Sequence, residues 1–193
     1  KVIVSIELQA RFDEENNISI SHRLSEVGAR VTYGVPPMKV HSKLMMIKHG
    51  KTVIAGLSTG NFHEGTAKLY VDSTLLTADK RVTADVEKVF TYLDEAAKNR
   101  TLAQPVFKQL LVSPFNTRKT LLKMLNREKA KGADGYVFIK TNHLTDDRLI
   151  RRIRATADAG VKMDLIVRTT YAMMPHENIR AISILDRYLE HQR

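Results

Sequence analysis

The 193-residue sequence has no cysteine and no tryptophan, and only 6% of its residues are aromatic. Without cysteine the chain forms no disulfide and no thiolate-ligated metal site, which is compatible with a reducing compartment. No apolar run approaches the roughly 18 residues that a membrane-spanning helix needs, and no signal peptide opens the chain. Because Lys1 precedes an apolar run directly, without an initiator Met, we expect a piece of a longer polypeptide.

Positive charge is in excess, with 31 Lys and Arg against 21 Asp and Glu and a formal net charge of +10. Such an excess favours a polyanionic partner, which could be nucleic acid, acidic lipid or a phosphate polymer. A basic soluble protein without a special ligand explains the charge equally well. Arginine-rich stretches such as DDRLIRRIRA are typical of the solvated face of a helix.

Apolar runs alternate with amphipathic segments along the chain, which predicts an α/β protein. Strands are expected at 2–8, 30–35, 39–47, 52–58, 71–78, 109–115, 136–141 and 162–168. Helices are expected at 13–29, 80–99, 117–133 and 145–161, with Thr145 capping the last. The strands 39–47 and 52–58 should form a hairpin, 101–107 is the linker candidate, and 179–193 fits either a strand or a helix.

Two of these stretches repeat one pattern. Residues 2–35 and 136–167 share a strand, a short loop, a helix that starts with acids and ends at glycine, and a second strand. Internal duplication of this length predicts two similar domains, which we place at 1–104 and 105–193. Generic α/β repetition is the alternative.

Three histidines stand two residues before a lysine or arginine, and about one is expected by chance from 7 His and 31 Lys+Arg. Residues i and i+2 of a strand share a face, so His41 and Lys43 would lie in one pocket. A lysine there disfavours the protonated imidazole and attracts an anion. His191 and Arg193 end the second copy, which predicts a pseudo-symmetric site at the junction of the domains. His49, in a predicted turn, is taken as the chance case.

Seven stretches carry a resemblance to a known family: ELQARFDEENN, KVHSKL, STGNFHEGTAKLYVD, LLTAD, LLVSPFN, GVKMDLIVR and NIRAISILDRYLEHQR. In this order they closely resemble the polyphosphate kinases, which make inorganic polyphosphate from ATP with a catalytic half of two phospholipase D-like domains. The resemblance implies an α/β fold of two phospholipase D-like domains, each a mixed sheet flanked by helices, with the second domain truncated.

The resemblance also implies roles for individual residues. His41 falls on the histidine that ATP phosphorylates, and His191 falls on a second essential histidine at the nucleotide side of the site. Tyr70 and Arg168 fall on residues that contact ATP. Arg11 falls on an arginine assigned to the magnesium–phosphate region. Because arginine is a hydrogen-bond donor and cannot ligate a cation, we expect Arg11 to bind phosphate oxygens that Mg²⁺ also bridges.

Further residues complete the expected ATP and phosphate pocket. Lys43 adds positive charge, with Arg193 as a further candidate, while Asn61 and Glu64 would line the pocket or orient His41. Structural alternatives remain open. Tyr70 fits a core residue, an arginine at a strand end fits a surface ion pair, and Asn61 could cap the helix that follows it.

The implied reaction is reversible transfer of the ATP γ-phosphate to inorganic polyphosphate through a phosphohistidine, with Mg²⁺, in the intact parent; the fragment itself is expected to be inactive. The implied partners are ATP, ADP and polyphosphate, in a homo-oligomeric parent without a specific nucleic acid. The expected location is cytoplasmic, with or without membrane association. Two alternatives stay open: a phospholipase D-type phosphodiesterase or nuclease, and a non-catalytic polyanion-binding module.

Overall fold

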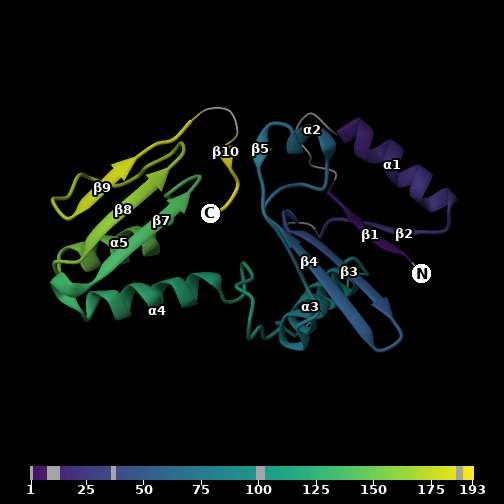
Figure 1. Ribbon diagram of the computed structural model, residues 1–193, viewed down its shortest axis with the longest axis horizontal. Helices are drawn as coiled ribbons and strands as arrows, with labels where there is room; N and C mark the ends of the chain where they lie inside the picture. Colours follow the sequence, from purple (N-terminus) through teal and green to yellow (C-terminus); the bar gives the residue numbers. More distant parts are fainter. Residues whose placement is uncertain (1, 8–13, 36–37, 99–102, 186–188) are drawn as a thin grey trace. The chain divides into compact units, whose positions relative to one another are not determined.

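The structure is a computed structural model that describes residues 2–7, 14–35, 38–98, 103–185 and 189–193. The chain forms two compact units (Figure 1). The first unit comprises Lys1–Leu57 and Leu75–Leu110, and the second unit comprises Ser58–Thr74 and Leu111–Arg193. The predicted division into sequence domains at residue 104 stays a prediction.

The first unit begins with a parallel β-α-β arrangement of β1 (Ile3–Ile6), α1 (Glu14–Glu26) and β2 (Arg30–Tyr33). The helix starts with two glutamates, whose charge complements the positive end of the helix dipole. It is followed by Gly28, whose φ of 80° is favourable only for glycine and whose N–H donates to the Ser25 carbonyl. The predicted strand, acidic helix start and glycine stop are confirmed.

The rest of the first unit is a second sheet and a long helix. The sheet has the order β3-β4-β6, formed by β3 (Lys43–His49), β4 (Thr52–Ser58) and β6 (Thr74–Thr77). Gly50 and Lys51 form the turn between β3 and β4, as the hairpin prediction required. Helix α3 (Lys80–Ala96) packs against β3, and Ala55, Val86 and Val89 are buried in this unit.

One buried carboxylate fixes the chain after α3. Asp85, on α3, is only 1% exposed. It accepts hydrogen bonds from the Lys88 ammonium at 2.9 Å and from three successive backbone N–H groups, those of Lys108, Gln109 and Leu110. Burial alone would raise the pKa of Asp85, but these hydrogen bonds outweigh it and lower the pKa to about 2.

The predicted strand at 109–115 is wrong. Its first backbone N–H groups are bound by the Asp85 carboxylate, and the N–H of Val112 donates to the Asn116 side-chain oxygen at 2.7 Å. Side chains therefore satisfy the N–H groups that a sheet ladder would otherwise use. The segment leads as irregular chain into helix α4 (Thr117–Lys129).

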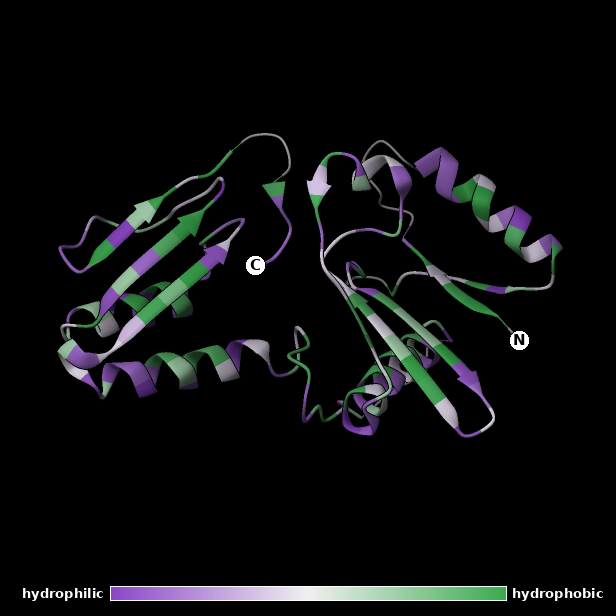
Figure 2. Ribbon diagram, viewed as in Figure 1, coloured by the Kyte–Doolittle hydropathy of each residue, from purple (hydrophilic) through white to green (hydrophobic). Residues whose placement is uncertain are grey.

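The second unit contains a parallel sheet with two helices on one face. The sheet has the order β7-β8-β9, formed by β7 (Tyr136–Thr141), β8 (Lys162–Val167) and β9 (Ile179–Ile182). Between β7 and β8 runs α5 (Asp147–Ala157), which packs against α4 (Figure 1). The first half of β8 alternates hydrophilic and hydrophobic residues (Figure 2), and its buried Met163 and Leu165 join Ile153 of α5 in the core.

Two predictions about the second unit need correction or completion. The cap of α5 is Asp146, not Thr145, since the Asp146 carboxylate accepts from the N–H of Leu149 at 3.0 Å. The undecided segment 179–193 contains two short strands in its described residues, β9 and β10 (Leu189–Glu190). The second unit also contains the 3₁₀ turn Gly132–Asp134, α2 (Glu64–Ala67) and β5 (Tyr70–Val71). Across the described ranges, no helix is long and apolar enough to cross a membrane.

Asp85→Asn should lower the free energy of unfolding by about 2–4 kcal/mol, because it leaves buried N–H groups and an ammonium without a carboxylate. The folded pKa of about 2 lies below the ordinary value of 3.8. The carboxylate therefore stabilises the fold fully above pH 4–5, and this stabilisation is lost as the pH falls through 3.8 toward 2. Urea unfolding at a series of pH values measures both effects.

The matched control is Glu87→Gln on the same helix, which removes a surface ion pair with Lys48 and should cost at most about 1 kcal/mol. Equal losses in the two variants, or a difference from the wild type that persists unchanged to pH 2, would contradict a structural role for the Asp85 carboxylate.

Candidate functional site

The second unit brings together two segments that are far apart in the sequence. Strand β10 runs parallel to β5, with Leu189 opposite Tyr70 and Glu190 opposite Val71. The pairing continues past the strands, since the N–H of His191 donates to the Val71 carbonyl at 3.2 Å. The residues that follow each strand therefore lie side by side.

Two contacts hold the imidazole ring of His191, a hydrogen bond at its edge and a stacked ring on its face. Its Nδ1 lies 2.6 Å from Oδ1 of Asp72, and because a carboxylate only accepts, Nδ1 must carry the proton. The imidazole also stacks on the Tyr70 ring, with a centroid distance of 4.0 Å and an angle of 22° between the planes. The side chains of His191 and Asp72 are each 19% exposed. The ring is thus oriented, and Nε2 is the nitrogen left for chemistry.

Gly60 allows the loop before α2 to lie against the Asp72 carboxylate, the hydrogen-bond partner of His191. A Cβ at Gly60 would be 1.8 Å from Oδ2 of Asp72 and 2.0 Å from its Cγ. No side chain fits there unless the carboxylate moves. The hydroxyl of Thr59 also lies 3.5 Å from Oδ1 of Asp72. A residue without a side chain is therefore required for Asp72 to reach His191.

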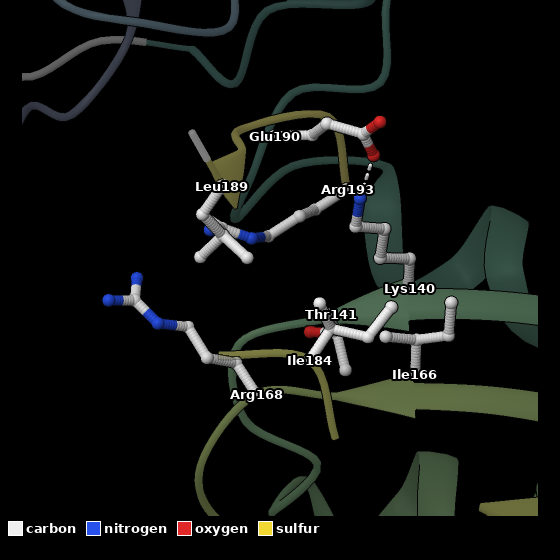
Figure 3. A pocket seen from close by; sticks show the side chains of 8 residues that line it. All are labelled: Lys140, Thr141, Ile166, Arg168, Ile184, Leu189, Glu190 and Arg193. Carbon is white, nitrogen blue, oxygen red and sulfur yellow. Dashed lines mark hydrogen bonds and ion pairs between the residues drawn. The ribbon is translucent and has the colours of Figure 1, made fainter. Parts of the chain in front are cut away.

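A shallow hollow, open to solvent, lies in the second unit (Figure 3). It is lined by Lys140, Thr141, Ile166, Arg168, Ile184, Leu189, Glu190 and Arg193. Arg168 directly follows β8, and its backbone N–H donates to the Thr141 carbonyl at 3.1 Å. The hollow thus adjoins the carboxyl ends of the parallel strands β7 and β8, which is where open α/β sheets commonly bind ligands.

His41 and Lys43 lie in the first unit, and the strand argument for them is wrong. The strand begins at Lys43, so His41 is exposed irregular chain just ahead of β3. The Lys43 ammonium turns back and donates to the backbone carbonyl of His41 at 2.7 Å. Lysine therefore contacts the main chain of His41, and the shared strand face that the sequence predicted does not exist.

The remaining predicted residues have other surroundings. Asn61 is exposed and does not cap α2, because the His63 ring Nδ1 accepts the capping hydrogen bonds from Gly65 and Thr66. Glu64 is the first residue of that helix and is exposed. Arg11 lies outside the described residues.

Sequence reasoning missed three residues of the arrangement: Gly60, Asp72 and Glu190. A signal for Asp72 was available, because it stands two residues after Tyr70 in LYVD, the spacing that places side chains on one side of an extended segment. Gly60 and Glu190 had no such signal. Their roles depend on the pairing of β5 with β10, which joins positions 119 residues apart.

A magnesium site built from protein ligands does not fit the residues that the structure describes. Among them no group of three or more His, Asp or Glu side chains converges. Mg²⁺ commonly binds through one or two carboxylates together with substrate phosphates and water. Any magnesium here would have to be held mainly by the phosphates of a bound ligand.

Comparisons with known proteins agree over both parts of the chain. Residues 1–99 match the family model described as Polyphosphate kinase C-terminal domain 1, and residues 110–193 match Polyphosphate kinase C-terminal domain 2. This chain is 44% identical over 205 residues to a curated protein named polyphosphate kinase from Salmonella typhimurium strain LT2. It is 43% identical over 205 residues to the polyphosphate kinase of Escherichia coli strain K12. Each alignment covers 100% of this chain and 29% of the relative.

The crystal structure of polyphosphate kinase from Porphyromonas gingivalis is also similar, with a TM-score of 0.79 and 38% sequence identity. That match covers 99% of this chain and 33% of the solved one. The α/β fold class predicted from the sequence is confirmed.

Asp72→Asn should allow the neutral imidazole of His191 to adopt both tautomers. An amide donates as well as accepts, so either ring nitrogen can then face residue 72. In ¹⁵N NMR of histidine-labelled protein at alkaline pH, the wild type should show His191 protonated on Nδ1 alone, and Asp72→Asn should show both tautomers. Gly60→Ala should do the same, because its Cβ displaces the carboxylate.

Asp158→Asn is the matched control, since Asp158 lies 3.1 Å from Nε2 of His176 in another histidine–aspartate pair. It should alter the His176 signals and leave those of His191 unchanged. Identical His191 signals in wild type, Asp72→Asn and Gly60→Ala would rule out the orienting role of Asp72.

Proposed function

The chain belongs to the polyphosphate kinase family, and on that premise we propose that the whole protein containing it transfers the γ-phosphate of ATP reversibly to inorganic polyphosphate. The chain spans 29% of the length of the curated relatives it matches, so the proposal concerns a larger protein. Within the described residues it is supported above all by the oriented imidazole of His191. The proposal also includes a division of the chain into two phospholipase D-like domains, at 1–104 and 105–193.

The proposed reaction has two balanced steps. In the first, a ring nitrogen of neutral His41 attacks the γ-phosphorus, a P–N bond forms, and the P–O bond to the departing ADP breaks. In the second, a terminal oxygen of polyphosphate attacks the phosphohistidine, the P–N bond breaks, and the polymer gains one phosphate. Neutral imidazole is available for this role near pH 7, since the ordinary pKa of histidine is about 6.5. The exposure of His41 is compatible with it.

We assign proton transfer to His191. With Nδ1 donating to Asp72, Nε2 is the nitrogen that can carry a proton to the leaving oxygen and recover it in reverse. The Asp72 carboxylate stabilises the imidazolium form while it exists, as the carboxylate of a hydrolase triad does. Tyr70 supports the ring by stacking and is proposed to contact ATP as well.

The remaining groups are proposed to bind the phosphates. Arg168 can offer a bidentate guanidinium to phosphoryl oxygens. Lys43, Asn61 and Arg11 are further candidates for phosphate contacts by resemblance to the family. Magnesium is proposed to enter with ATP, where it would neutralise phosphate oxygens without a protein cage.

Exposure of the whole enzyme to γ-³²P-labelled ATP should label His41. The adduct should be acid-labile and alkali-stable, as a phosphoramidate is, and His41→Ala should abolish it. His49→Ala is the matched control, since His49 lies at the end of β3 before a turn, and this variant should be labelled like the wild type. Phosphopeptide mapping identifies the site.

Other outcomes separate the alternatives. A phospholipase D-type phosphodiesterase or nuclease would take no label from the γ-position and would cleave a diester. A polyanion-binding module would bind polyphosphate equally well with and without His41. Acid-stable label, or label on Ser42, would contradict the phosphohistidine.

Arg168→Lys should impair the use of ATP although the charge is retained, because the bidentate fork is lost. We expect a loss of roughly 1.5–3 kcal/mol in kcat/KM for ATP, the range of hydrogen bonds to charged groups. Arg151→Lys, on a solvent-exposed ion pair with Asp147, should have no effect. Unchanged ATP kinetics in Arg168→Lys would contradict the phosphate contact and favour a surface residue that does not bind ATP.

A further inference from the structure

Helices α4 and α5 concentrate positive charge outside the hollow, which is lined by other elements. Together the two helices contain nine Lys and Arg and only two acids, Glu128 and Asp147. Hydrophilic residues recur along α4 (Figure 2). Three of the arginines pair with aspartates, namely Arg118, Arg151 and Arg154. So large an excess of positive charge on two packed helices favours an anionic partner.

Two contacts show how the helices lie against each other. Near their amino ends, the Arg118 guanidinium pairs with the Asp146 carboxylate at 2.8 Å. Further along both helices, the Arg152 guanidinium donates to the side-chain oxygen of Asn126. Because the second contact lies beyond the first on each helix, α4 and α5 run side by side in the same direction.

Four cations border the line where the helices meet. On α4, Lys119 and Lys123 precede Asn126 by seven and three residues, and these spacings place side chains on one side of a helix. On α5, Arg148 precedes Arg152 by four residues and shares its side for the same reason. Arg152 is half-buried and the other three cations are exposed. These four cations form what we call the α4–α5 strip.

The charges of the strip are not neutralised. Within the residues that the structure describes, no carboxylate lies within ion-pair distance of Lys119, Lys123 or Arg148. Arg152 contacts a neutral amide, which leaves its charge uncompensated. Residues four apart on a helix are separated by about 6 Å along its axis, so the strip presents a row of positive charges. A linear polyanion matches such a row, because its charges also recur at short, regular intervals.

We propose that the α4–α5 strip binds the body of the polyphosphate chain, at a surface separate from the transfer site. The inference rests on the proposed function, which supplies the ligand, and adds a second contact region to it. Strand β7 ends at Thr141, which lines the hollow, and α5 begins shortly after it at Asp147. The amino end of the strip therefore lies at the end of the unit that carries the hollow. A polymer that leaves the hollow can continue along the strip.

Nucleic acid is the other linear polyanion to consider for this row of charges. Proteins that bind single strands combine cations with aromatic side chains, on which the bases stack. Neither helix contains Phe, Tyr or Trp. Ammonium and guanidinium groups alone recognise charge and not bases, so the strip favours a polymer whose repeating unit is a bare phosphate.

The test is binding of long-chain polyphosphate to the whole enzyme over a series of salt concentrations. The variant that combines Lys119→Gln, Lys123→Gln and Arg148→Gln should bind about 10-fold or more weakly at low salt. The slope of log K against log salt should become shallower by about 2, since each lost contact contributes about 0.7–0.9. Sodium tripolyphosphate is short enough to be held at the transfer site alone, so it should bind the variant and the wild type alike.

The control variant combines Lys131→Gln, Arg151→Gln and Arg154→Gln. It removes the same charge from three cations that already pair with acids, and it should leave the affinity and the salt slope nearly unchanged. Exchanging Lys119 and Lys123 for Arg and Arg148 for Lys should also preserve binding, because the strip acts through charge. Labelling of His41 by γ-³²P-labelled ATP should be equal in all variants.

Four outcomes would overturn an idea, and they differ. If the strip variant binds long-chain polyphosphate like the control variant, the strip is refuted, and the proposed function stands as long as His41 is labelled. If the wild-type enzyme takes no label, the proposed function is refuted itself. If labelling fails in the strip variant alone, these residues act in the transfer step and the separate surface is refuted. If the strip variant loses binding to poly(U) RNA and keeps binding to polyphosphate, the strip belongs to nucleic acid and the proposal is wrong.

Discussion

The hydrogen bond between Asp72 and His191 joins segments 119 positions apart and orients the imidazole on which the candidate site depends. Closing so long a loop is entropically unfavourable, so the contact has to be supported by several groups at once. The parallel pairing of β5 with β10, the stacking of Tyr70 and the absence of a side chain at Gly60 supply that support. Because these interactions share the same few residues, we expect them to form and break together.

Three carboxylates of this basic chain orient other groups. Asp85 collects three backbone N–H groups and an ammonium, Asp146 caps a helix, and Asp72 fixes an imidazole. Asp85 and Asp146 also form ion pairs, with Lys88 and Arg118, yet the chain has 31 Lys and Arg against only 21 acids. Such an excess of positive charge favours an anion, whereas a converging set of acids would have bound a cation.

Much of the fold could be predicted from local pattern, and the failures have a common physical cause. The periods of 2 and 3.6 residues located both parallel β-α-β arrangements. In the second of them, α5 buries Ile153 and Ala157 in a core shared with β8. The segment 109–115 also has the composition of a strand, yet Asp85 and Asn116 bind its N–H groups. The Lys43 ammonium likewise donates to the backbone carbonyl of His41, where the pattern had predicted a strand face shared by the two side chains. Competition by side chains for backbone groups is decided by tertiary structure, which a periodic pattern does not contain.

The candidate site was predictable in its residue types and not in its support. His191, Tyr70 and Arg168 were named from motifs that cover nearly the whole chain, and the structure places His191 on Tyr70. The support of His191 was not visible, because Asp72 and Gly60 act on it only once β10 lies beside β5. A histidine alone can rotate and exchange tautomers. The supporting residues restrict His191 to one geometry, so the orientation of this ring is encoded in the pairing of two strands of two residues each.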